Sequence, residues 1–557
     1  MKKQLLFIFF LFPVLVFSQN KWVRDFYDYD HFTARKVIES YDGGYYILGN
    51  YKDKDWYTWL KKLDVNGNEL WTREFTGEGK YLNLADLVED KEGNLYLGGE
   101  CEFLEYNSEN PLITAKDPVL VKINACGELV FGKIYHTPDN HFDYIKRLFL
   151  QENGNILVEL YHKSWSNVGK SSSANRIGLF SMSSSGEILW SQYINIANGC
   201  FSDISYGYRF CSNGDILISG CSYVEKPGTK EGWSRGWLLR ADSEANIKWI
   251  SIPTKDIWDS RYTHDNNWCA VESPDKKSIY AAFRRMVGKA ILHTGIMKFD
   301  ATNGKYLGVN NFFDQNGTSL LTEMQFINEN LLVGCYGYTL KSEENIIEEE
   351  VPGCIILFDT MANIRNKVDL KAENFPKMLL TRDQKILMCH NSDSSKEKII
   401  LQKYNLKLEH DTIYTKPGTF DYKCNHSVEK KKEINVKDFQ ALEGAVGINE
   451  SQNPLRLKEL KAFPNPFKDK FKVVLPEYIQ DKQSCEGIKI VTNRYSYHED
   501  VKLEILDING RVIQVQKVDQ AFKELWVYAD DWIDGIYLVR LIVKGKIAAR
   551  VKVIKGN

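Results

Sequence analysis

Short apolar runs alternate with polar turns over most of the chain, and the same arrangement returns about every sixty residues. The clearest copy spans residues 44–75, GYYILGNYKDKDWYTWLKKLDVNGNELWTREF. It contains two apolar runs, a polar loop, a D-x-N-G turn and a further run that opens with Leu-Trp. Self-similarity at a fixed period indicates a repeat fold.

A turn motif fixes the register of this repeat. It reads LDVNGNELW at 63–71, INACGELVF at 123–131, SSSGEILW at 183–190, ADSEANIKW at 241–249, FDATNGKYL at 299–307 and FDTMANIRN at 358–366. Its first position is occupied by Asp64, Asn124, Ser183, Asp242, Asp300 and Asp359. Asp or Asn followed by Gly is tight-turn chemistry, because glycine accepts a positive φ without a side-chain clash.

Each unit predicts four short strands, and no segment keeps a 3.6-residue period. Four strands per repeat are typical of a β-propeller blade, so we expect an all-β propeller of about seven blades over residues 19–415. Residues 21–27, KWVRDFY, match the fourth strand LWTREF and could complete the last blade, which would remove the open edges of the ring. Residues 408–414 could also be that fourth strand, and the sequence leaves both possibilities open.

The pattern changes after the propeller. Residues 416–459 are polar and contain the charge run EKKKEINVKD, which predicts a linker or a loosely packed extension. From residue 460 the chain again alternates apolar and polar positions between turns: FPNPF at 463–467, LDINGRVI at 506–513, DGIYLVRL at 534–541 and VKVIKGN at 551–557. Short alternating strands of this kind predict a small Ig-like β-sandwich over residues 460–557.

These four motifs resemble the type A C-terminal sorting domain of the type IX secretion system of Bacteroidetes. The resemblance implies transport across the outer membrane by the type IX machinery, followed by release or attachment to the cell surface. The residues that carry it are Pro464, Asn465, Pro466, Asp507, Gly510, Arg511, Gly535, Tyr537 and Lys555. The longer middle of this sequence, residues 477–499, departs from the family pattern.

The first eighteen residues read as a secretory signal peptide. Lys2 and Lys3 precede an apolar run that is too short to span a bilayer. Cleavage between Ser18 and Gln19 is expected, so the mature protein would have no transmembrane segment. The chain has 11 cysteines, an odd number, so at least one is free or pairs outside the chain. Four of them end the same type of strand, which favours small buried side chains over a disulfide framework: Cys101, Cys221, Cys335 and Cys389.

Charge and motifs exclude several classes of function. The net charge of −2 shows no basic footprint for nucleic acid, and no metal or cofactor motif occurs. Gly232, Ser234 and Gly236 match the G-x-S-x-G of serine hydrolases, but the segment reads as a Gly-rich turn in a polar loop with no helix behind it. His264 has no nameable partner. The tryptophans of the fourth strands favour packing between blades over a quinone cofactor.

Aromatic residues near the long loops suggest what the ring does. They are Trp56, Tyr57, Trp59, Trp165, Trp233, Trp237, Trp258 and Trp268. Exposed aromatics on a rigid scaffold suit glycan or protein binding, although some of them must be core. The sequence therefore predicts a secreted or cell-surface propeller that binds a glycan or a protein. The alternatives are a propeller-type glycosidase or lyase, with convergent carboxylates at the central mouth, and a purely structural surface protein.

Overall fold

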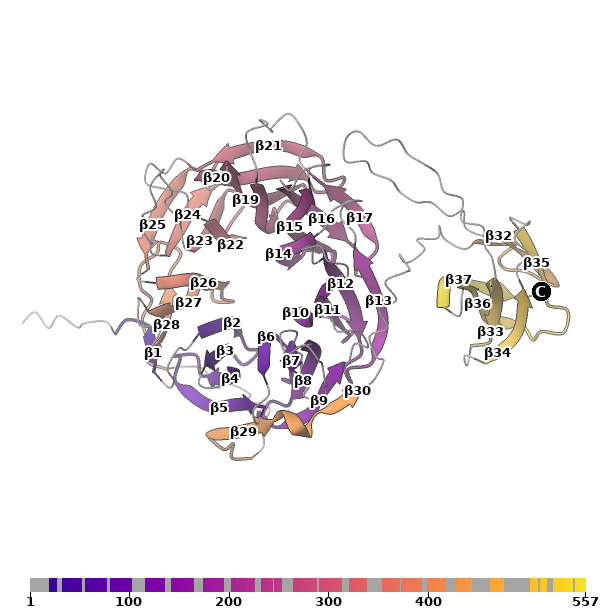
Figure 1. Cartoon of the computed structure of the whole chain (residues 1–557), viewed down its shortest axis with the longest axis horizontal. Coiled ribbons are helices and arrows are strands. Elements are labelled where there is room, and N and C mark those ends of the chain that lie inside the picture. The colour runs from indigo at the N-terminus through magenta and orange to yellow at the C-terminus, as the bar shows by residue number, and fades with distance from the viewer. Residues whose placement is uncertain are drawn as a thin grey trace, which may run out of the picture. The chain divides into compact units, whose positions relative to one another are not determined.

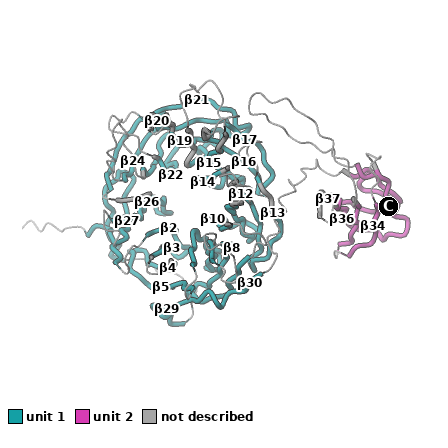
Figure 2. Tube along the Cα trace, viewed as in Figure 1, with its two compact units in different colours: residues 1–196, 200–447 teal, residues 197–199, 448–557 magenta. Residues whose placement is uncertain are grey.

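A computed structural model describes residues 20–27, 33–52, 56–77, 81–102, 116–135, 142–164, 174–194, 202–225, 232–243, 245–252, 264–287, 290–312, 320–337, 353–370, 372–392, 398–416, 424, 426–442, 461–474, 501–508, 511–517, 524–543 and 546–556. The chain forms two compact units (Figure 2). One contains residues 1–196 and 200–447, and the other contains residues 197–199 and 448–557.

The first unit is a ring of seven four-stranded antiparallel blades (Figure 1). Blade 1 contains β2 (Thr33–Glu39), β3 (Tyr45–Lys52), β4 (Trp56–Leu63) and β5 (Glu69–Thr76). Blade 2 contains β6 (Leu82–Glu89), β7 (Leu95–Glu102), β8 (Lys116–Ile123) and β9 (Leu129–Tyr135). Blade 3 contains β10 (Phe142–Leu150), β11 (Ile156–Ser164), β12 (Ala174–Met182) and β13 (Ile188–Ile194). Blade 4 contains β14 (Ser202–Phe210), β15 (Ile216–Glu225), β16 (Gly232–Ala241) and β17 (Ile247–Ser251).

The remaining three blades follow the same order. Blade 5 contains β18 (His264–Glu272), β19 (Ser278–Val287), β20 (Ala290–Asp300) and β21 (Tyr306–Asn311). Blade 6 contains β22 (Leu320–Phe326), β23 (Leu331–Gly337), β24 (Cys354–Asp359) and β25 (Ile364–Asp369). Blade 7 contains β26 (Ala372–Leu380), β27 (Ile386–Ser392), β28 (Ile399–Tyr404) and β1 (Val23–Phe26). The first strand of each blade faces the centre of the ring, and the prediction of about seven blades is confirmed.

The ring closes through the N-terminal strand. β1 pairs directly with β28, with Val23 opposite Gln402 and Phe26 opposite Ile399. The competing segment, residues 408–414, returns beside this pair, and the Trp22 backbone N–H donates to the Asp411 carbonyl at 2.8 Å. The N-terminal strand therefore supplies the fourth strand of blade 7, and the two ends of the chain segment that builds the ring pair with each other.

Tryptophans of the fourth strands pack against the register turn of the next blade. The Trp22 indole is fully buried and its Nε1 donates to the Val65 carbonyl at 3.1 Å. Trp249 likewise donates to the Ala301 carbonyl at 3.2 Å. A Cβ atom on Gly67 would lie 2.8 Å from the Trp22 ring, so this turn needs glycine for its positive φ and for the close approach. Packing between blades is thus the role of these two indoles.

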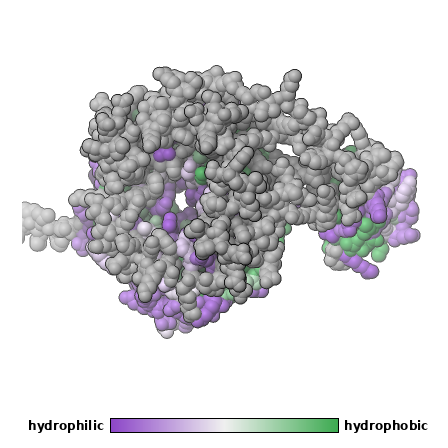
Figure 3. All heavy atoms as spheres, in the orientation of Figure 1, coloured by the Kyte–Doolittle hydropathy of each residue, from purple (hydrophilic) through white to green (hydrophobic). Residues whose placement is uncertain are grey.

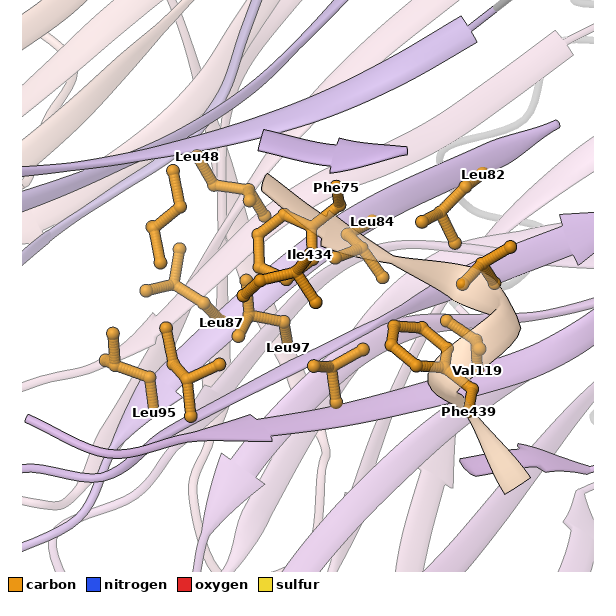
Figure 4. Packing of buried hydrophobic residues seen from close by; sticks show 14 of the residues in the cluster. Leu48, Phe75, Leu82, Leu84, Leu87, Leu95, Leu97, Val119, Ile434 and Phe439 are labelled. Atoms are coloured by element: carbon orange, nitrogen blue, oxygen red, sulfur yellow. The ribbon is translucent and has the colours of Figure 1, made fainter. Parts of the chain in front are cut away.

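The segment expected to be a linker or extension is partly structured. After Cys424, β29 (Lys431–Asn435) pairs in parallel with β5, the 3-10 turn η2 (Val436–Asp438) follows, and β30 (Gln440–Leu442) pairs in parallel with β9. Ile434 and Phe439 insert into the core shared by blades 1 and 2 (Figure 4). We call residues 424–442 the extension clamp, because they add an outer strand to each of these two blades.

One disulfide holds the start of the extension clamp. Cys126, in the register turn of blade 2, is bonded to Cys424, with Cα atoms 5.3 Å apart. The cysteines predicted to be small buried side chains are confirmed as buried. They are Cys101, Cys221, Cys335 and Cys389.

The second unit consists of two sheets around one core. One sheet has β31 (Lys461–Phe463), β32 (Lys470–Val474) and β35 (Glu524–Tyr528), and the other has β34 (Val512–Lys517), β33 (Val501–Leu506), β36 (Gly535–Val543) and β37 (Lys546–Lys555). Phe471, Ile505 and Val539 are among the fully buried residues between them. Within the residues that the structure describes, no helix is long and apolar enough to cross a membrane.

Candidate functional site: the central channel

The first strand of every blade carries a β-bulge at the same place. The register shifts lie between residues 34 and 36, 84 and 86, 145 and 147, 205 and 207, 267 and 269, 321 and 323, and 373 and 377. A bulge leaves residues out of the ladder and redirects the side chains beside it. The residues that follow the bulges form a ring around the centre, which we call the bulge ring: Lys36, Asp86, Arg147, Gly207, Cys269, Glu323 and Lys377.

Several members of the bulge ring connect neighbouring blades. Lys36 of blade 1 pairs with Asp86 of blade 2 at 2.8 Å. Arg147 of blade 3 donates from Nη2 to the Tyr206 carbonyl of blade 4 at 2.7 Å. Cys269 of blade 5 contacts the Leu321 carbonyl of blade 6 at 3.7 Å. The ring therefore has a structural role in holding the blades together.

The two carboxylates of the bulge ring are engaged. Asp86 is buried, and besides Lys36 it accepts from the Leu148 backbone N–H at 2.9 Å. Glu323 accepts from the Met378 backbone N–H at 3.2 Å. These acids belong to blades 2 and 6 and each satisfies a backbone donor of the following blade. This arrangement differs from the carboxylate pair that glycoside hydrolysis requires.

Basic groups of three blades occupy the equivalent position of the bulge ring: Lys36, Arg147 and Lys377. Burial lowers the pKa of the Lys377 ammonium; the charges of Arg147 and Lys36 lower it further, and Glu323 opposes the shift. Like charges that perturb one another in this way lie close together. Side chains of Lys36 and Arg147 are about one third exposed. Hydrophilic residues border the opening at the centre of the ring (Figure 3).

The bulged residues add to this charge. Arg35 is exposed in the bulge of β2. Lys146, in the bulge of β10, donates from Nζ to the Ser205 hydroxyl at 3.0 Å. Burial lowers the pKa of Lys146 to about 8, with Glu159 opposing the shift and Arg147 adding to it. The described ring and bulge positions thus combine five basic groups with two engaged acids.

The aromatic side chains predicted near the loops divide into core and undescribed residues. Trp59 and Trp237 are fully buried at equivalent places in their blades, each packed against a glycine of the preceding strand, Gly49 or Gly220. Tyr57 is half-buried and stacks on Tyr51 at 5.1 Å. Side chains of the other five lie outside the described residues: Trp56, Trp165, Trp233, Trp258 and Trp268. Of the three described side chains, two therefore belong to the core and one is partly exposed.

The G-x-S-x-G segment is not the turn that the sequence predicts. Gly232, Ser234 and Gly236 lie inside β16, where Ser234 pairs with Tyr223 of β15. A parallel pairing also places the Ser234 backbone beside that of His264 in the next blade. The hydrolase motif works as a strained turn between a strand and a helix, and a continuous strand does not provide that geometry.

One other group has metal-ligating atoms. Sulfur and nitrogen atoms of Cys126, Cys424 and His426 lie within 4.8 Å of one another. Because the two sulfurs are joined in a disulfide, they are not thiolates and cannot act as thiolate ligands.

In the second unit the predicted sorting residues hold the fold together. The Asn465 side chain, between Pro464 and Pro466, donates to the Lys552 carbonyl and accepts from the Ile554 N–H, both at 2.9 Å. It thereby fastens the loop after β31 to β37. Phe467, next to Pro466, is buried and packs against Phe471, with ring centroids 4.6 Å apart.

The remaining motifs fix two turns and the C-terminal strand. Asp507 Oδ1 accepts from the Arg511 N–H at 2.9 Å, and Gly510 lies outside the described residues. Lys555 donates to the carbonyls of Ala529 at 2.7 Å and Trp532 at 2.6 Å. The ammonium group of Lys555 therefore satisfies the backbone of the loop between β35 and β36.

The same loop is held from its other end. Tyr537, three residues into β36 after Gly535, is buried and hydrogen-bonds the Ile533 carbonyl. The sorting motifs thus act on β37 and on three connections, which follow β31, β33 and β35.

Residues 461–555 match the family described as "Secretion system C-terminal sorting domain". The C-terminal unit is a type IX secretion sorting domain. The protein is accordingly exported by the type IX system to the cell surface or the medium, and its sorting domain implies interaction with that machinery. No curated protein matches the chain.

Among solved structures the ring is similar to other propellers. The Dos1 propeller is 12% identical, with a TM-score of 0.39, over 71% of this chain and 97% of that one. An ulvan lyase of polysaccharide lyase family PL25 is 12% identical, with a TM-score of 0.43, over 69% of this chain and 96% of that one. A protein of unknown function from Dyadobacter fermentans DSM 18053 is 11% identical, with a TM-score of 0.38, over 57% and 93%. At these scores the likeness carries no inference about ligand or activity.

Bulge-ring residues were missed by the sequence reasoning, although a signal for them exists. Each lies seven positions before the same place in the first hairpin turn of its blade, as Lys36 does before Gly43 and Asp86 before Gly93. Counting back from the turns would have aligned seven positions of differing chemistry on one level of the ring.

Proposed function

We propose that the exported propeller binds an anionic glycan, carrying carboxylate or sulfate groups, through the basic groups of the bulge ring. The observation that carries the proposal is the placement of Lys36, Arg147 and Lys377 at the equivalent bulge position of three different blades. Guanidinium and ammonium groups are strong hydrogen-bond donors to carboxylate and sulfate oxygens. A recessed cluster of one charge sign also attracts oppositely charged polymers over a distance.

Binding is favoured over cleavage by the state of the carboxylates. Asp86 and Glu323 are already used by backbone donors, so neither is poised as a general acid or base. A lyase is the alternative, because burial lowers the pKa of Lys146 to about 8, near that of a useful base. We further propose that removal of residues 1–18, before Gln19, precedes export of the mature protein.

The test compares Arg147→Gln/Lys377→Gln with the wild-type protein, using ulvan and alginate as anionic probes and laminarin as the neutral one. We expect the anionic probes to bind, and to bind less tightly as salt rises. The double variant should lose about tenfold in affinity or more, because charge-assisted contacts are removed. The matched control is Arg365→Gln/Lys367→Gln on the outer strand β25, where both side chains are exposed.

The proposal would be contradicted if the two double variants bound ulvan and alginate with the same affinity. It would also be contradicted if the wild-type protein preferred laminarin. Absorbance of unsaturated uronate product, followed in the same mixtures, separates a lyase from a binder. Accumulation of that product by the wild type would move the assignment to the enzyme.

A further inference from the structure

A cavity of about 400 Å³ lies where blade 1, blade 2 and the extension clamp meet. Its walls come from hairpin turns and outer strands of the blades and from the first residues of the clamp, whereas the bulge ring lies on the first strands. The residues that matter for its chemistry are Tyr41, Asp42, Lys62, Trp71, Glu89 and His426. We call this cavity the clamp pocket.

The clamp pocket contains a buried ion pair. Lys62 Nζ lies 2.6 Å from Asp42 Oδ2, and both side chains are buried. The Lys62 ammonium also lies 4.1 Å from the centre of the Tyr46 ring. Burial lowers the pKa of Lys62, and Asp42 opposes the shift. The pair offers a ligand both a donor and an acceptor with little net charge.

A second carboxylate lies in the same wall. Glu89 of blade 2 accepts from the Ser40 hydroxyl and from the Tyr41 N–H of blade 1, each at 2.8 Å. These contacts fix the orientation of the carboxylate. Burial raises the pKa of Glu89, and its contacts with Ser40 and Tyr41 oppose the shift. The charged groups of the pocket therefore include both signs, which suits neither a polyanion nor a simple cation.

Aromatic surface completes the pocket. Tyr41 is 52% exposed at the tip of the first hairpin of blade 1, although it belongs to a residue type that is usually more buried. The Trp71 indole lies in the pocket wall and is otherwise buried. A flat aromatic face beside fixed carboxylate and ammonium groups suits a ring that is apolar on one side and carries hydroxyl groups around its edge.

We propose that the clamp pocket binds one or two neutral sugar residues, with Tyr41 as the stacking face and with Asp42, Lys62 and Glu89 as partners of the sugar hydroxyls. The pocket volume lies within the usual range for small-ligand sites. Cys424 and His426 form part of the wall, so the Cys126–Cys424 disulfide helps to define the site. This site is separate from the bulge ring and takes uncharged rather than anionic glycan.

The experiment uses saturation-transfer NMR on the full mature chain with glucose, galactose, mannose and N-acetylglucosamine as probes. We expect at least one probe to bind. Tyr41→Ala should weaken that binding about three- to tenfold, the value of an aromatic contact, whereas Tyr41→Phe keeps the ring and should bind as the wild type does. The matched control is Tyr27→Ala, which removes a similarly exposed tyrosine that directly follows β1.

The proposal would be overturned if no probe gave a signal with the wild type, or if Tyr41→Ala and Tyr27→Ala gave equal signals. It would also be overturned if Tyr41→Phe lost as much signal as Tyr41→Ala. A second measurement uses Cys424→Ser, which breaks the disulfide to Cys126 and frees the start of the clamp, while Tyr41, Asp42, Lys62 and Glu89 stay unchanged. It should also weaken the sugar signal. Arg147→Gln/Lys377→Gln should leave the signal unchanged, so failure of the channel proposal and failure of this one are distinguishable.

Discussion

The register turns recur at one backbone position of successive blades, and the bulge-ring residues recur at another. The two sets differ in their chemistry. At the turns, the first residue accepts from the backbone two and four residues on, as Asp64 does from Asn66 and Asn68 at 2.8 Å. At the bulge ring, the same backbone position carries lysine, aspartate, arginine, glycine, cysteine or glutamate. The turn places a demand on residue type, because it needs a short acceptor and a positive φ. The bulge does not restrict the residue type, so the side chains at this position can differ from blade to blade.

The difference shows which repeated position can carry specificity. Turn residues hold the ring together in two ways, because they form the turn itself and they also accept hydrogen bonds from side chains of the preceding blade. Donors to the turn carbonyls are Trp22, Arg73, Tyr135 and Trp249. The bulge ring holds blades together with whatever polar pair is available and leaves Lys36 and Arg147 partly exposed. Changes at turns should therefore cost stability, and changes at the ring should mainly alter binding.

The largest effect expected is from Trp22→Ala, which removes a turn contact at the closure of the ring. The indole is fully buried, packs edge-on against Tyr45 at 5.8 Å and donates to the Val65 carbonyl. Loss of such a side chain should lower the free energy of unfolding by about 3–5 kcal/mol. Thermal and urea unfolding of the propeller measure this.

Tyr27→Ala, at the exposed end of the same strand, is the control for this prediction and should change the unfolding free energy little. A similar small change in Trp22→Ala would mean that the segment 408–414 can close the ring without β1.

The regularity of the turns explains how much the sequence could predict. Strand number and blade number follow from spacings and turn residues that any copy of the repeat must keep, whereas the sorting domain follows from the resemblance of its four motifs to a known family. The turns give the positions of the bulge ring, but its chemistry does not repeat, so the sequence pattern alone does not mark these positions as a site. Lys377, for example, reads as one polar residue before the run Met378, Leu379, Leu380.

The extension clamp escaped prediction for a different reason. Its charge run reads as solvated, and only Ile434, Val436 and Phe439 are apolar enough to be buried. Three apolar residues are too few to define a period. They are buried because the edges of β5 and β9 offer backbone partners and because Gly132 leaves room for the Phe439 ring. Both conditions depend on residues about 300 positions away, which local pattern cannot show.

The second prediction concerns the one register turn that has a covalent bond. Removing the disulfide with Cys126→Ser/Cys424→Ser should lower the free energy of unfolding by about 2–4 kcal/mol, since the bond closes a span of 298 residues. An exported protein meets the oxidising conditions in which such a bond persists. Reduction of the wild type should reproduce the loss. Cys389→Ser changes a buried cysteine that takes no part in this bond. On reduction, this variant should lose no more unfolding free energy than the wild type loses.

If the double variant were as stable as the wild type, the extension clamp would be held by β29 and β30 alone.

The smallest effect expected is a pH dependence that the turns should not share. Lys146 in the bulge of β10 has a folded pKa of about 8, below its ordinary value of 10.5, because of burial. The channel should therefore lose one positive charge as pH rises through 8, and affinity for alginate should fall by at most about fivefold. Lys146→Arg stays charged and should keep its affinity over the same range.

Folding stability should move in the opposite direction, which gives the prediction a second readout. Between pH 8 and 10.5 the unfolded chain holds a proton on Lys146 that the folded protein has released. The unfolded state binds more protons, so this residue alone makes the folded protein more stable as pH rises through that window. The difference between the wild type and Lys146→Met isolates it from other titrating groups. As pH rises, we expect weaker alginate binding together with an increasing difference in stability between the wild type and Lys146→Met. If alginate binding by the wild type did not change with pH, Lys146 would be excluded from the binding site.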